Sequence, residues 1–102
     1  MTKPYYEDYA THAIRFYARN PALNMKSPGL KLVDIQNWNA CNDVLRKYPE
    51  RDQAIILGVF KSKCVLSDAV ECIAAQYKMN SGNVWQLLNR FSADFAVNRG
   101  LI

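Results

Sequence analysis

The chain has 102 residues, of which 50% are hydrophobic and 12% aromatic, and its net charge is +4 at neutral pH. This length suits one domain with one core, and so large a share of apolar side chains argues against disorder. No segment shows the sustained apolar and polar alternation of strands, which argues against an all-β fold. The charge is spread evenly, with 7 basic and 5 acidic residues up to position 50 and 6 and 4 after it. The sequence therefore predicts no basic tail, and its mild basicity suits an anionic partner without requiring one.

The cysteines and the single histidine follow no metal-binding or disulfide pattern. Cys41, Cys64 and Cys72 are an odd number with wide spacing, and His12 lies far from them in the sequence. We therefore expect no metal, no cofactor and reduced, mostly buried cysteines. The first eight residues lack an apolar signal core and no later segment is apolar enough to span a bilayer, so we expect a cytoplasmic protein with no membrane contact.

The first helix is predicted from about Pro4 to Asn20. Proline suits the first helical position, and Pro21 disfavours helix in the residue before it. Aromatic and small residues recur at spacings of three and four and are expected to face the core: Tyr6, Tyr9, Ala13, Phe16 and Tyr17. Residues 21–32 carry two prolines and a glycine, which predicts a loop.

A second helix is predicted over residues 33–48, with Asp34 as its N-cap. Its expected apolar face consists of Ile35, Trp38, Cys41, Leu45 and Tyr48. Four polar residues are expected to face away from the core: Asn37, Asn39, Asn42 and Asp43.

Three more helices are predicted in the second half of the chain. Pro49 opens the third, which is apolar nearly all round and is expected to be the central helix. Ser67 is the expected N-cap of the fourth, whose predicted apolar face is Val70, Ile73, Ala74 and Tyr77. Asn80 or Ser81 is expected to cap a fifth helix over residues 82–98, and Gly100 to end it in a left-handed conformation. The fifth helix has an apolar stripe of Val84, Leu87, Leu88, Phe91 and Phe95.

The prediction is one all-α domain of about five helices, with N-terminal helices in residues 1–48 and a helix-turn-helix in residues 49–102.

Residues 67–91 have the spacing of a helix-turn-helix, in which a supporting helix and a short turn present a second helix to the DNA major groove. Ile73 and Ala74 are expected on the supporting helix, and Val84 and Leu88 are expected to hold the second helix against the core. The side chains between them are then left to point outward as candidate base contacts: Ser81, Asn83, Trp85, Gln86 and Asn89. Asn and Gln pair bidentately with adenine, which gives this set a chemical rationale.

The same half of the chain resembles region 4 of sigma-70-type sigma factors. The likeness comprises the run from Tyr48 to Asp52, an apolar helix that ends at Phe60, then Leu66-Ser67-Asp68, Ile73-Ala74, and the run from Met79 to Val84. The chain is also similar to small sigma-factor-like or phage-regulator-like proteins of Gram-positive bacteria and their mobile elements. The resemblance implies a non-enzymatic transcription regulator that binds double-stranded DNA.

One departure from that family concerns charge. Its recognition helix usually carries several basic residues, whereas only Arg90 is basic between Asn80 and Phe91 here. Candidate phosphate contacts are therefore spread along the chain: Lys61, Lys63, Lys78, Arg90 and Arg99. The low charge also favours an alternative, in which the helix-turn-helix binds RNA polymerase or another regulator, with Trp85 at the contact. A third hypothesis is a homodimer formed through the tyrosine-rich first helix.

Catalysis has no clear candidate site in the sequence. Asp68, Glu71 and Asp94 lie where helix caps and exposed faces place acidic residues. No spacing favours pairing Cys64 or Cys72 with His12 as a nucleophile and base. We therefore predict no enzymatic activity.

Overall fold

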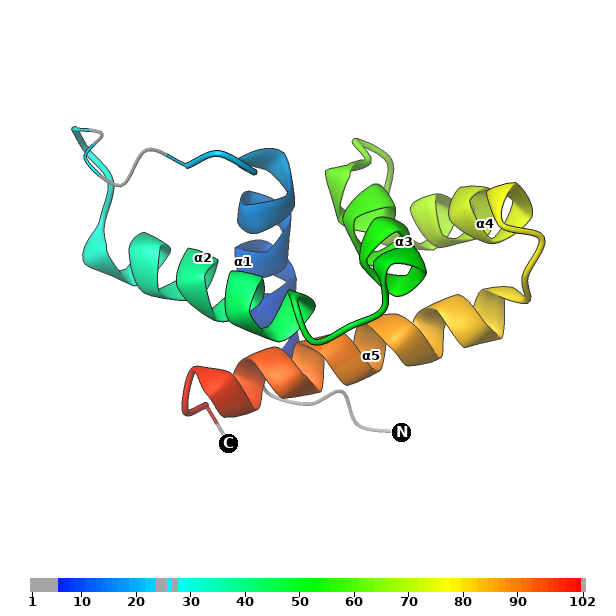
Figure 1. The fold of residues 1–102 in the computed structure, drawn as a ribbon. Coiled ribbons are helices and arrows are strands. Elements are labelled where there is room, and N and C mark those ends of the chain that lie inside the picture. The colour runs from blue at the N-terminus through cyan, green and yellow to red at the C-terminus, as the bar shows by residue number, and fades with distance from the viewer. Residues whose placement is uncertain (1–5, 24–25, 27, 102) are drawn as a thin grey trace.

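The computed structural model of the protein describes residues 6–23, 26 and 28–101, and these residues form an all-α bundle without strands. Its helices are α1 (Glu7–Arg19), α2 (Leu32–Leu45), α3 (Glu50–Lys61), α4 (Leu66–Gln76) and α5 (Ser81–Asn98). The predicted fold class is thus confirmed. In Figure 1, α5 runs along the base of the molecule, and the other four helices lie above it. α5 contacts all four of them.

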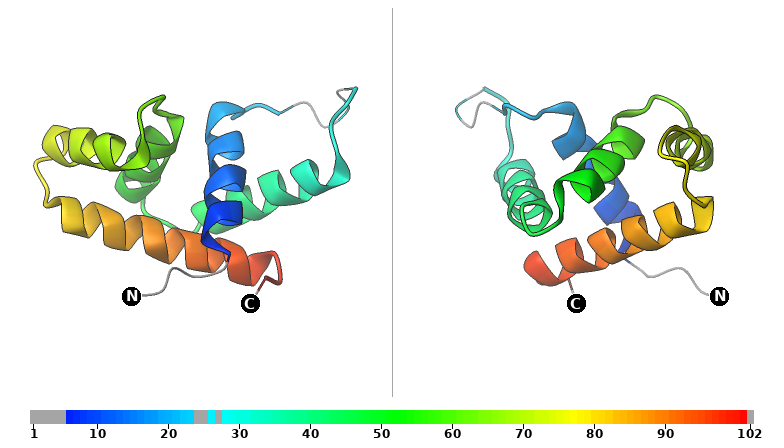
Figure 2. Two further views of the ribbon diagram at one scale, coloured as in Figure 1. Left: turned by 180° about the vertical axis from the view of Figure 1, so that it is seen from behind. Right: turned by 45° about the vertical axis from the view of Figure 1, so that its right-hand side comes forward.

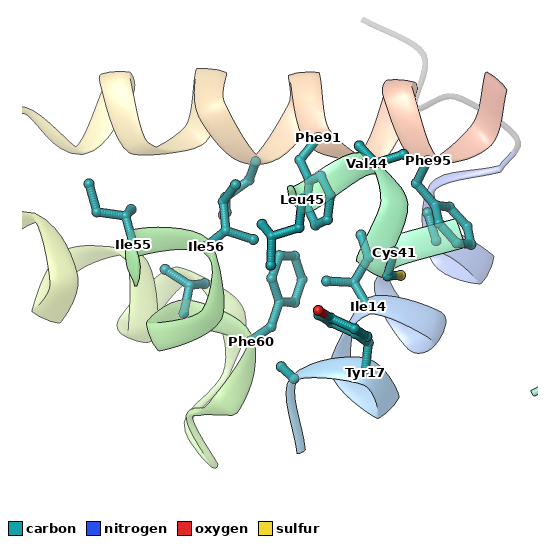
Figure 3. Packing of buried hydrophobic residues seen from close by; sticks show 14 of the residues in the cluster. Ile14, Tyr17, Cys41, Val44, Leu45, Ile55, Ile56, Phe60, Phe91 and Phe95 are labelled. Atoms are coloured by element: carbon teal, nitrogen blue, oxygen red, sulfur yellow. The ribbon is translucent and has the colours of Figure 1, made fainter. Parts of the chain in front are cut away.

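The core lies where α1, α2 and α3 meet the upper face of α5. Phe60 of α3 and the α5 residues Phe91 and Phe95 are almost completely buried. Figure 3 shows Phe60 beside Leu45 and Ile14, with Phe91 reaching down from α5. α3 does not have the fully buried environment predicted for it, because its outer side leaves residues such as Ala54 exposed. The helix that joins the whole bundle is α5.

The face that α1 turns to the core is rotated from the predicted one. Its buried residues are Ala10, Ala13, Ile14, Tyr17 and Ala18, whereas Tyr9 is 41% exposed and Phe16 is half-buried. The alanines allow close approach of the neighbouring helices, and the rings of Tyr9 and Phe16 lie at the border of the contact. The predicted start near Pro4 lies outside the described residues.

Helix α2 is shorter than predicted, and one of its asparagines is buried. The helix begins after the N-cap residue Lys31. Asp34 is the third residue of the helix, and its side chain accepts a hydrogen bond from the Lys31 backbone N–H at 3.4 Å. Asp34 is therefore not the N-cap. The expectation that Asn37 faces solvent is wrong: its Nδ2 donates to the Tyr9 hydroxyl at 3.0 Å, and its Oδ1 accepts from Arg99 Nε at 2.7 Å. These bonds link α1, α2 and the end of α5.

Two further predictions about capping and cysteines are corrected. Val65, not Ser67, is the N-cap residue of α4, and no side chain caps that helix. Cys41 is buried, but Cys64 and Cys72 are exposed. The start of α3 directly after Pro49 is confirmed. Among the described residues, no helix has the length and apolarity that crossing a membrane requires.

Candidate nucleic-acid interface

A four-residue turn, residues 77–80, joins α4 to α5. Lys78 has a φ of 53°, in the left-handed region, which reverses the chain at the end of α4. The backbone N–H of Met79 then donates to the carbonyl of Ala74 at 2.9 Å. The Asn80 side chain accepts from the Gly82 backbone N–H at 2.7 Å and caps α5, as predicted.

The two helices cross at a large angle and pack through the predicted residues. Figure 2 shows α4 nearly end-on in its right-hand view, where α5 lies along the picture. Val84, Leu88 and Ala74 are buried between them and the core. Ile73, Tyr77 and Met79 are half-buried and pack against the same cluster. The chain is therefore interrupted at Met79, and the outer side of α5 is left uncovered.

Three of the five candidate base contacts lie freely on that outer side. Asn83, Gln86 and Asn89 are exposed, and their side chains have no hydrogen-bond partner in the described part of the chain. Ser81 and Trp85 are half-buried, and Trp85 packs against the edge of the core. The open face of the N-terminal half of α5 thus carries three amide side chains.

Arg90 lies on the same open side of α5, with its guanidinium over the Tyr48 ring. Its guanidinium carbon lies 5.4 Å from the centre of the Tyr48 ring, and the Tyr48 hydroxyl donates to Asp94 at 2.6 Å. Burial and the hydrogen bond to Asp94 raise the pKa of Tyr48, so the hydroxyl stays protonated and keeps donating. Arg90 and Lys47 share an open pocket of about 530 Å³ with the acidic residues Asp52 and Asp94.

The structure does not gather all the predicted phosphate contacts near the exposed amides of α5. Lys61 and Lys63 are exposed at the C-terminal end of α3 and in the loop after it, on the side of the molecule away from α5 (Figure 1). Arg99 lies about 27 Å along the helix axis from Ser81 and is hydrogen-bonded to Asn37. Lys78, in the turn, and Arg90 are the two predicted cations that flank the amide face.

Arg51 is a further cation beside the turn that sequence reasoning missed. Its Nη2 donates to the carbonyl oxygen of Tyr77 at 3.5 Å, and its guanidinium lies 5.9 Å from the centre of the Tyr77 ring. A cation in the first turn of α3 opposes the dipole of α3, but here it lies at the C-terminal end of α4, where a positive charge is favourable. That unfavourable placement within its own helix was the one signal available in the sequence.

In comparisons with known proteins, the sequence matches no protein family, no curated protein and no solved structure.

Proposed function

We propose that this protein is a sequence-selective DNA-binding regulator that inserts the outer face of α5 into the major groove. The observation that carries the proposal is the row of exposed amides at Asn83, Gln86 and Asn89 on a helix held by α4 across a short turn. An α-helix with its side chains is about 10–12 Å wide, which fits a major groove about 12 Å wide.

The positive charges beside this face support the same partner. Lys78 lies in the turn before α5, Arg51 contacts Tyr77 at the start of the same turn, and Arg90 follows the amides on α5. Cations at the border of a base-reading helix are placed to contact phosphates, which orient a protein on the duplex. Since they are few, non-specific affinity is expected to be low, and discrimination has to come from the amides.

The proposal is tested by selecting binding sites from a pool of random duplexes at about 50 mM salt, a concentration at which phosphate contacts are strong. We expect a defined sequence to be enriched. Asn83→Ala and Gln86→Ala should each weaken binding to it by about 1–3 kcal/mol, or roughly 5- to 150-fold. Gln36→Ala is the matched control, because Gln36 is an exposed amide on α2. If no duplex is retained at this salt, the proposal is wrong.

A protein partner is the second candidate, because residues 81–89 carry no charge at all. RNA polymerase or another regulator would then bind α5 through Trp85. DNA comes first because Trp85 is half-buried and the large apolar residues most exposed in the described ranges lie away from it. Val97 lies near the C-terminal end of α5, and the others lie outside α5: Tyr9, Leu32, Val33 and Val65. Loss of a co-purifying regulator with Trp85→Ala, but not with Gln36→Ala, would favour the protein partner. Self-association through α1 stays a prediction.

A further inference from the structure

We infer that α5 reads adenine, so that the target is a duplex with adenines at two or three neighbouring positions in the major groove. This inference rests on the proposed function. It specifies the class of base that the exposed face of α5 recognises.

The chemistry of the open face matches one base edge better than the others. An amide side chain offers a donor and an acceptor side by side. Adenine presents the complementary pair, the N7 acceptor and the N6 donor, whereas guanine presents two acceptors and is read best by Arg or Lys. No basic residue lies between Lys78 and Arg90, and Arg90 is already positioned over the Tyr48 ring.

The three amides on this face are available for pairing, unlike the structural amides of the fold. Asn80 uses its side-chain oxygen to cap α5, and Asn37 is bonded to Tyr9 and Arg99. Asn83, Gln86 and Asn89 are exposed and have no such partner within the described ranges. Because no hydrogen bond within the described ranges uses these side chains, a base edge can pair with them without breaking a contact that holds the fold.

The spacing of these amides matches neighbouring base pairs. They recur every third residue along α5, so the first and last are about 9 Å apart along the helix axis. Base pairs are stacked about 3.4 Å apart, so this length covers two to three steps. Successive amides are also rotated by about 60° around the helix, which directs them to successive positions in a curving groove.

The test uses the full chain and the best duplex from the selection. In one version every adenine of the enriched site is replaced by 7-deazaadenine, which lacks the N7 acceptor but still pairs with thymine. In a second version every guanine is replaced by 7-deazaguanine. We expect at least a 5-fold loss of affinity with 7-deazaadenine and less than a 2-fold change with 7-deazaguanine. Equal binding to the 7-deazaadenine duplex, or a loss with 7-deazaguanine alone, would overturn the inference.

A change of specificity gives a second test. Gln86→Arg should change the base preferred at one position from adenine to guanine when sites are selected again. Gln36→Arg adds the same charge at an exposed position on α2 and should leave the preferred sequence unchanged. An unaltered adenine preference with Gln86→Arg would contradict the inference. Failure of every duplex to bind would instead overturn the proposed function itself.

Discussion

Gly58 of α3 lies so close to Ile73 of α4 that a Cβ added to the glycine would be 2.8 Å from the Ile73 Cδ1 atom. Real Cβ atoms do not approach other atoms this closely, so an alanine at position 58 would have to push the flexible tip of the Ile73 side chain aside. The absence of a side chain at Gly58 therefore leaves room for the Ile73 tip where α4 packs against α3.

The effect of replacing Gly58 on the unfolding free energy should depend on the side chain at position 73. Gly58→Ala gains up to about 1 kcal/mol of helix propensity, but it displaces the tip of Ile73, so we expect a change in unfolding free energy close to zero. In an Ile73→Val background, which lacks Cδ1, the same substitution should stabilise the protein by up to about 1 kcal/mol. Urea unfolding of the four proteins in this cycle measures the coupling. Additive effects would show that the two side chains do not compete for space.

Lys78→Gly should stabilise the protein and weaken its binding to DNA. A residue other than glycine in the left-handed region carries a penalty of about 1 kcal/mol, which the glycine removes. The substitution also removes a cation beside the amide face. Thermal unfolding and titration with the selected duplex separate the two effects. Lys63→Gly is the control, because Lys63 has no positive φ and should gain no stability.

Asn37→Ala should destabilise the protein by about 1–3 kcal/mol, because it removes the hydrogen bonds that a buried side chain makes with two partners, one of them charged. The groups affected are the Tyr9 hydroxyl and the Arg99 guanidinium. Asn39→Ala changes an exposed residue of the same helix and should alter the unfolding free energy by less than about 0.5 kcal/mol. Equal unfolding midpoints in urea for the two variants would show that the buried asparagine contributes nothing.

Stability should fall in alkaline solution because of Cys41. Burial raises the pKa of this thiol to about 12 from an ordinary value near 9.0. The unfolded thiol loses its proton first, so the stabilisation is complete below pH 9 and is lost as the pH rises towards 12, at up to about 1.4 kcal/mol per pH unit. Urea unfolding at several pH values should give a shallower decline for Cys41→Ala. An unchanged slope would assign the decline to Tyr17 and Tyr48, whose pKa values burial also raises.

Binding to the selected duplex should depend only weakly on salt. If Lys78, Arg90 and Arg51 each neutralise one phosphate, a plot of log affinity against log salt has a slope of about −2.7. Lys78→Ala should reduce its magnitude by about 0.9. Lys63→Ala should leave the slope unchanged, because the loop that contains Lys63 lies away from α5 (Figure 1). A slope much steeper than −5 would require phosphate contacts from other parts of the chain.

Local signals made most of the fold predictable from the sequence. Pro49 marks the start of α3, Asn80 caps α5 and Gly100, with a φ of 74°, ends it. Each of these features depends on residues only a few positions away. The outward position of Asn83 and Gln86 also followed from the apolar stripe of their own helix.

The features that sequence reasoning missed depend on contacts between distant parts of the chain. Asn37 is buried because Tyr9, 28 positions earlier, and Arg99, 62 positions later, hold its side chain. Arg51 lies beside the turn because α3 brings its first residues against Tyr77. No periodicity within one helix contains that information. The rotated face of α1 has the same origin, because the helices that pack against α1 determine which of its residues are buried.

Because α5 contacts every other helix, a tilt or shift of α5 would disturb its packing against all of them. A ligand on its outer face would therefore meet a preformed, rigid surface and lose little conformational entropy on docking. The free energy of binding would add to the free energy of unfolding of the whole bundle. Amide hydrogen exchange should then slow in α1 and α2 as well as in α5, although neither helix touches the ligand.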